Sequence, residues 1–141
     1  MPTEQKHAVD IRGLAPLLQV FDMPASLHFY RDIMGFEVAA KSDDGEGDKV
    51  YWVLMKHGNV EFMLNEMYEC DRRPSLPDEQ RTRAHYDTSI YFGCSNVDAA
   101  YKHFTAKGVD LKEPVITKYN FWAIYVKDPD GYLLVFHWPV G

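Results

Sequence analysis

An internal repeat is the feature that most constrains how this chain can fold. Residues 14–39 have the pattern of a strand, a helix and a second strand, and residues 88–111 repeat that order. The residues that precede the two helices, Asp22 and Asn96, are 74 positions apart, and the glycines that follow them, Gly35 and Gly108, are 73 apart. Two copies of one supersecondary unit therefore account for most of the 141 residues.

The local chemistry of both segments predicts helices. Asp22 and Asn96 carry side-chain oxygens that can accept the free N–H groups of a first helical turn, and Pro24 falls where its missing N–H has no cost. Gly35 and Gly108 suit the left-handed residue that ends a helix. Apolar side chains recur at helical spacing in each segment, at Leu27, Tyr30, Ile33 and Met34 and at Val97, Ala100, Tyr101 and Phe104.

Three strand-like runs follow each helix, at 36–42, 49–57 and 59–66 and then at 109–118, 121–127 and 132–138. The turn Asp128-Pro-Asp-Gly131 is typical of a hairpin, because Pro presets φ and Gly accepts a positive φ. The sequence therefore predicts an α+β fold with two βαβββ modules, residues 10–66 and 86–138, joined by a charged linker, residues 67–85, in one structural domain, 1–141. A four-stranded sheet with one helix leaves one face uncovered, so we expect the two sheets to curve around a cleft, either within the chain or across a dimer.

The composition excludes several kinds of partner. Fifteen Lys and Arg against 21 Asp and Glu give a net charge of −6, which is unsuited to binding the phosphates of a nucleic acid. No apolar run is long enough to span a membrane, and residues 1–12 do not have the apolar stretch of a secretory signal. Cys70 and Cys94 form no CxxC or zinc spacing. A cytoplasmic location is the expectation, with Cys94 a small core residue and Cys70 exposed.

The ordered set of motifs resembles the vicinal oxygen chelate superfamily, which includes glyoxalase I, extradiol dioxygenases, fosfomycin-modifying enzymes and bleomycin resistance proteins. The matching stretches are Val20–Phe36, Asn96–Tyr101, Lys107–Val109 and Val126–Leu134. With the strands between them they cover nearly the whole chain. The resemblance implies the glyoxalase/bleomycin resistance fold, which agrees with the two predicted modules, and it leaves the chemistry open because the superfamily carries many activities.

The resemblance also implies where a metal would bind. Superfamily enzymes take a ligand seven residues before each helix cap, here Ala15 and Ser89, and one in the last strand of each module, here Glu61 and Val135. Only Glu61 of these four residues is a useful ligand, and a divalent metal needs three or four. We therefore expect no metal and no other cofactor. The alternative is a lyase or dioxygenase that uses Glu61 and His137, with Gln19 as a third ligand.

The family's strand phase places alternate side chains in the cleft. It predicts a mostly apolar small-molecule site with aromatic walls, although a shift of one residue would exchange the faces, replacing Trp122 by Phe121 and Trp52 by Tyr51. The candidate ligand-binding residues are Leu17, Gln19, Trp52, Glu61, Met63, Tyr91, Trp122, Val135 and His137.

The chain most resembles the metal-free bleomycin resistance proteins, which implies a cytoplasmic antibiotic-resistance role in which a dimer sequesters an aromatic or cationic small molecule by stacking and cation–π attraction. The segment Tyr119–Ile124 lacks the Arg-Glu pair that those proteins usually carry, so a ligand other than bleomycin is equally compatible. A two-fold homodimer is also expected, because exposed sheet edges favour association.

Overall fold

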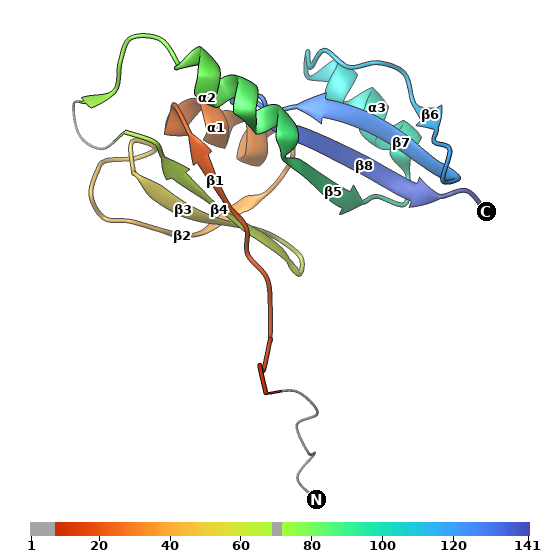
Figure 1. Ribbon diagram of the computed structural model, residues 1–141, viewed down its shortest axis with the longest axis horizontal. Helices are drawn as coiled ribbons and strands as arrows, with labels where there is room; N and C mark the ends of the chain where they lie inside the picture. Colours follow the sequence, from red (N-terminus) through yellow and green to blue (C-terminus); the bar gives the residue numbers. More distant parts are fainter. Residues whose placement is uncertain (1–7, 69–71) are drawn as a thin grey trace, which may run out of the picture.

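The computed structural model describes residues 8–68 and 72–141. Within these residues the chain forms two four-stranded sheets, which lie side by side in Figure 1. Each sheet is built from one half of the chain, as the repeat predicts, and the predicted α+β class is confirmed. No helix among the described residues is long and apolar enough to cross a membrane. Cys70 lies outside the described residues.

The first sheet has the strand order β1-β4-β3-β2. Its strands are β1 (Leu17–Val20), β2 (Glu37–Lys41), β3 (Trp52–His57) and β4 (Val60–Glu66). β1 pairs with β4 in parallel, and the other neighbours are antiparallel. The connection from β1 to β2 is helical: α1 (Met23–Leu27) continues directly into a π-helical segment, η1 (His28–Ile33).

The second sheet repeats this topology with the order β5-β8-β7-β6. Its strands are β5 (Ser89–Gly93), β6 (Val115–Ile116), β7 (Phe121–Lys127) and β8 (Leu133–Pro139), and α3 (Val97–Ala106) follows β5. The predicted strand 109–118 is wrong in length. Val109 and Leu111 pack against the core without joining the ladder, and only two residues pair with β7.

The segment between the sheets contains a helix that the sequence pattern did not predict. α2 (Glu79–Ala84) is followed by a 3₁₀ turn, η3 (His85–Asp87), and the Asp78 carboxylate accepts the Gln80 N–H at 2.9 Å as its cap. None of the α2 side chains is buried. An apolar helical period is therefore missing, and that period is the main signal by which helices are recognised.

The two predicted helix caps differ in the structure. The Asn96 side chain accepts the Ala99 N–H at 3.0 Å, as expected. Asp22 occupies the cap position without a side-chain cap bond, and the Met23 N–H donates instead to the Glu66 carboxylate at 3.0 Å. Gly35 and Gly108 have φ of 91° and 81°, which confirms their predicted helix-ending conformation.

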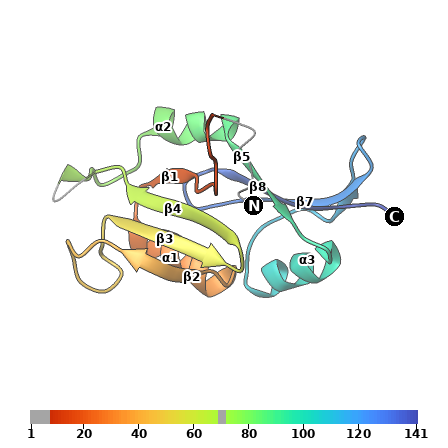
Figure 2. The same ribbon diagram turned by 90° about the horizontal axis from the view of Figure 1, so that it is seen from below.

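A single hydrophobic core joins the two halves of the chain. The helix-covered faces of both sheets contribute to it, and the rings of Phe36 and Phe92, one from each half, lie 6.1 Å apart. Phe92 in turn stacks on Phe136 at 5.1 Å. Cys94 packs against this core, as predicted. Because the helical sides of both sheets are buried together, the opposite face of each sheet remains open to solvent, and Figure 2 shows the same arrangement from below.

Candidate ligand-binding site: two open sheet faces

The first open face belongs to the sheet of β1 and β4. Leu17 is opposite Met63 and Trp52 is opposite Asn65, which places these side chains on the face away from the buried Leu18. The predicted residues that share this face are Leu17, Gln19, Trp52, Glu61 and Met63. These five side chains are half-buried or exposed, and together they form a wall of mixed polarity.

Polar contacts hold part of this first wall in place. The Asn65 amide donates to the Gln19 side-chain oxygen at 3.4 Å, and Lys56 Nζ lies 3.9 Å from the Glu61 carboxylate. Both groups of this ion pair are largely exposed, so the pair contributes little to stability. It leaves Glu61 beside a cation.

The second open face carries an aromatic cavity of about 520 Å³. The His137 ring stacks on Phe121 with 4.7 Å between centroids, and Tyr91 meets the other side of His137 edge-on at 5.1 Å. The lining residues all come from the second half of the chain: Tyr91, Val115, Thr117, Lys118, Tyr119, Phe121, Ala123, Tyr125, Val135 and His137. This size and apolar lining are typical of a small-molecule site.

The structure corrects the predicted position of Trp122. Trp122 lies opposite Trp138 in the β7–β8 ladder, in phase with the buried Ile124, and packs against the hydrophobic core. Phe121 occupies the open face instead. The prediction missed by one residue because β7 is apolar on both sides, so its sequence does not show which set of alternate residues faces the core. The other eight candidate residues lie on the two open faces.

At the positions where superfamily enzymes bind a metal, this chain has few side chains that could act as ligands. Ser89 and Val135 lie on the second sheet, and Val135 is fully buried beneath the aromatic cavity. Glu61 and His137 lie on different sheets, the first beside Lys56 and the second between two aromatic rings. Among residues 8–68 and 72–141, no three His, Cys, Asp or Glu side chains are grouped closely enough to hold a metal ion.

The Asp128-Pro-Asp-Gly turn connects the two halves of the chain. The buried hydroxyl of Tyr30, in η1, donates to the Asp128 carboxylate. Asp130 accepts the Phe21 N–H at 2.7 Å and the Ser26 hydroxyl at 3.3 Å. The sequence identified this segment only as a hairpin turn, since nothing in the four residues indicates a partner about 100 positions earlier.

Burial of this turn changes its electrostatics. Removal from water raises the pKa of Asp128 to about 6, opposed by the hydrogen bond from Tyr30. Burial raises the pKa of Asp130 as well, and that of Tyr30 rises well above its usual range. A perturbed carboxyl pair of this kind can mark a functional site, but here each carboxylate is occupied by structural hydrogen bonds.

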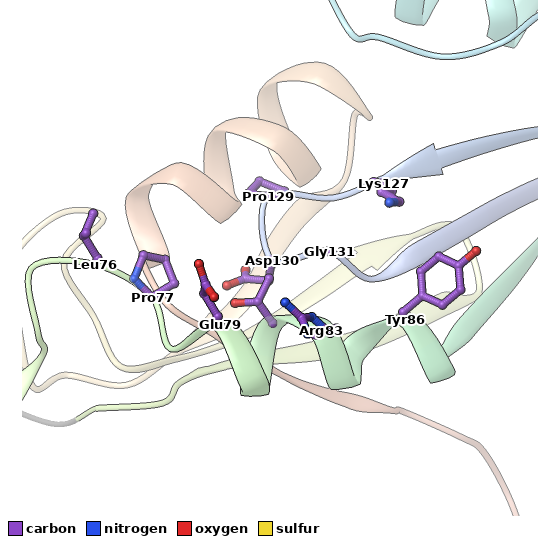
Figure 3. Close-up of a pocket in the computed structure, with 10 residues that line it drawn as sticks. Leu76, Pro77, Glu79, Arg83, Tyr86, Lys127, Pro129, Asp130 and Gly131 are labelled. Carbon is purple, nitrogen blue, oxygen red and sulfur yellow. The ribbon is translucent and has the colours of Figure 1, made fainter.

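A second cavity, of about 580 Å³, lies between α2 and the β7–β8 turn. Figure 3 shows Arg83 and Tyr86 on the helical side, Lys127 at the end of β7 and Asp130 on the turn. The Lys127 ammonium lies 5.3 Å from the centre of the Tyr86 ring. This cavity is separate from the open faces and lies beside the junction formed by Asp128 and Asp130.

Comparisons with known proteins agree with this geometry. The family model described as the glyoxalase/bleomycin resistance protein/dioxygenase superfamily matches residues 6–136. No curated protein matches the chain in sequence.

Solved structures share the fold at low sequence identity. TnmS3, described as an antibiotic binding protein from Streptomyces sp. CB03234, superimposes with a TM-score of 0.68 at 18% identity, covering 95% of this chain and 100% of its own. A lactoylglutathione lyase from Agrobacterium tumefaciens gives 0.66 at 19% identity, covering 92% of this chain and 94% of its own. Identity at this level shows the fold alone.

Proposed function

Because the chain belongs to the glyoxalase/bleomycin resistance protein/dioxygenase superfamily, we propose that it is a small-molecule binding protein that sequesters a planar aromatic, preferably cationic, ligand without a metal. The observation that carries this proposal is the environment of His137. Its ring stacks on Phe121, contacts Tyr91 edge-on and forms part of an aromatic wall. Aromatic faces attract flat rings and cations. The antibiotic-binding relative with the same fold supports the proposal.

We further propose that the complete cleft forms between two copies of the chain. The shared core places the helix-covered faces of both sheets inward, which leaves each open face without a covering element among residues 8–68 and 72–141. A two-fold dimer would bring the first open face of one copy against the second open face of the other, and each cleft would then have one polar wall and one aromatic wall.

A titration with a planar cation tests the binding function. We expect acridine orange to bind the wild-type protein more tightly than the planar anion anthracene-9-carboxylate in isothermal titration calorimetry. Tyr91→Ala should raise the dissociation constant for acridine orange at least tenfold, because it removes one side of the aromatic wall. Tyr86→Ala is the matched control. Tyr86 is 63% exposed and Tyr91 59%, but Tyr86 lies in η3 and lines the cavity beside α2 instead of the aromatic cavity. Equal effects of the two substitutions, or no binding of either compound, would contradict the proposal.

The alternative function is a metal-dependent lyase or dioxygenase that uses Glu61 and His137, and the same dimer favours it by bringing these residues of two copies toward one cleft. Adding Zn²⁺, Ni²⁺ or Fe²⁺ to chelator-treated protein separates the two functions, because a ligand that binds the native state raises Tm. We expect no shift in Tm. A rise of several degrees that disappears in His137→Ala would favour the enzyme.

A further inference from the structure

The cavity of about 580 Å³ beside α2, which we call the α2 cavity, has no part in the proposed function. It is comparable in size to the aromatic cavity of about 520 Å³. Its walls come from residues 76–86, from the end of β7 and from the turn that follows β7. Both its volume and its mixture of apolar, aromatic and charged lining suit a small molecule.

The two walls of the α2 cavity are held together by specific contacts. The His85 ring stacks on Tyr132 with 4.0 Å between centroids, and its Nδ1–H donates to the Asp130 carbonyl at 2.7 Å. Gly131 has a φ of 86°, and a Cβ added there would lie 3.3 Å from the Thr82 carbonyl oxygen. A larger residue at position 131 would force the helix away from the turn, so the glycine permits this close approach. The cavity is therefore a preformed feature of the fold.

The charged side chains that line this cavity are separated by sign. Figure 3 shows Glu79 beside Pro77 toward one end, and Arg83, Tyr86 and Lys127 toward the other. Arg83 and Lys127 reach this end from different elements, the first from α2 and the second from the last position of β7. Two cations and an exposed tyrosine ring therefore share one end of the cavity.

Neither cation at this end is neutralised by the fold. Among residues 8–68 and 72–141, no carboxylate lies within ion-pair distance of Arg83 or Lys127. The Asp130 carboxylate is engaged elsewhere, because its hydrogen bonds are made to the first half of the chain. The Lys127 ammonium lies 5.3 Å from the centre of the Tyr86 ring. In a chain of net charge −6, this end of the cavity is thus a local site of attraction for anions.

These three groups specify the chemistry of a ligand. The exposed Tyr86 ring provides a face for a second aromatic ring. A guanidinium offers parallel N–H donors to a phosphate, and an ammonium adds a point charge. A phosphate monoester carries close to two negative charges at pH 7, so it matches the pair of cations, whereas a carboxylate would leave one of them unpaired. The short distance between the Lys127 ammonium and the ring favours a phosphate attached directly to the aromatic ring.

We propose that the α2 cavity is a second ligand site, which binds a small aryl phosphate with its phosphate between Arg83 and Lys127 and its ring against Tyr86. The site shares no lining residue with the aromatic cavity, and it prefers the opposite ligand charge. The inference therefore does not depend on the proposed function.

Isothermal titration calorimetry with 1-naphthyl phosphate provides the first test. We expect the wild-type protein to bind this compound about tenfold or more tightly than 1-naphthol, which lacks the charge, and inorganic phosphate, which lacks the ring. Arg83→Gln and Lys127→Gln should each raise its dissociation constant about fivefold, the upper range for an exposed ion pair. Absence of binding by the wild type, or equal affinity for inorganic phosphate, overturns the proposal.

Lys112→Gln is the matched control for these charge changes. Lys112 is exposed and does not line the cavity, so its substitution removes the same unit of charge from another part of the surface. We expect the control to change the dissociation constant less than about twofold, because distant exposed charges are screened by salt. A control that weakens binding as much as Arg83→Gln would reveal a general effect of net charge and refute the site. Equal Tm values for the three variants verify that folding is unchanged.

Amide chemical shifts locate the bound compound. In ¹H–¹⁵N spectra recorded during the titration, residues 82–86 and 127–131 should shift. The aromatic cavity has a cation of its own, Lys118, and shifts confined to residues 117–125 would place the aryl phosphate there and overturn the second site.

The acridine orange titration judges the proposed function separately. A protein that binds 1-naphthyl phosphate beside α2 but does not bind acridine orange refutes the proposed function and leaves the second site in place. A protein that binds acridine orange through Tyr91 and does not bind 1-naphthyl phosphate refutes only the second site.

Discussion

Asp128 and Asp130 connect the two halves of the chain, because the fold buries the turn that carries them. The Asp128 carboxylate accepts the N–H groups of Asp130 and Tyr132, both at 2.9 Å, and the hydroxyl of Tyr30 from the other half of the chain. Tyr132 adds a further link, since its hydroxyl donates to the Gln19 carbonyl in β1 at 3.0 Å. The side chains at this junction therefore hold the second sheet against the strand that carries the first open face.

The raised pKa of Asp128 predicts an unusual pH dependence of stability. A carboxyl whose pKa is about 6 in the folded state and 3.8 in the unfolded state binds more protons when folded. Its contribution to stability is therefore fully present below pH 3.8 and is lost as the pH rises through 6, by about 3 kcal/mol. Asp128→Asn cannot ionise, so urea unfolding should show wild-type stability falling relative to this variant between pH 4 and pH 7.

Tyr30→Phe is the companion variant for this measurement. It keeps the ring in the core and removes the hydrogen bond that favours the ionised carboxylate. The pH-dependent change should then move to higher pH than in the wild type. A stability difference between wild type and Asp128→Asn that is constant from pH 4 to pH 7 would contradict the assignment.

The helices show that one sequence signal can have two structural outcomes. Asn96 and Asp22 both stand directly before a helix, but only Asn96 caps it with its side chain. The Asp22 carboxylate lies 3.6 Å from the Arg73 guanidinium instead, and Glu66 of β4 takes the N–H of Met23. A residue from a neighbouring strand has replaced the local cap.

Cap substitutions should separate these two arrangements. We expect Asn96→Ala to lower the free energy of unfolding by about 1 kcal/mol, because the Ala99 N–H loses its partner. Asp22→Ala should cost less than half as much, since no cap bond is lost. Urea denaturation at pH 7 measures both, and a larger loss for Asp22→Ala than for Asn96→Ala would show that the cap assignment is wrong.

The whole molecule is organised by which faces it buries. Both helix-covered faces enter one core, while the open faces carry the exposed Tyr91 and Tyr125 on the second sheet and Leu17 on the first. β1 and β5 are terminal strands of their sheets, so each has one edge that is not paired with another strand of its sheet. Open edges next to apolar faces favour association with a second copy.

This arrangement predicts a dimer in solution. Sedimentation at micromolar concentration should give about twice the 16.3 kDa mass of the chain. Dilution should shift the protein toward the monomer, because a reversible dimer dissociates at low concentration. A mass of one chain at every concentration tested would refute both the dimer and the shared cleft.

The sequence by itself determined the repeat, the α+β class and the paired glycines, whereas the strand phase that places eight of the nine candidate side chains on the open faces came from the resemblance to the superfamily. These features follow from local preferences: cap chemistry, positive φ and the alternation of strands act over a few residues. It also predicted the core position of Cys94 from strand phase alone.

Only the tertiary structure decided the features that depend on distant partners. Three features depend on partners outside the local segment: the face of β7 on which Trp122 lies, the use of Glu66 in place of an Asp22 cap, and the burial of Asp128 against Tyr30. The same holds for the orientation of the two sheets, since a repeat defines each unit but not which of its faces is buried against the other. That choice follows from how much apolar surface the packed halves remove from water, a quantity that no local stretch of sequence contains.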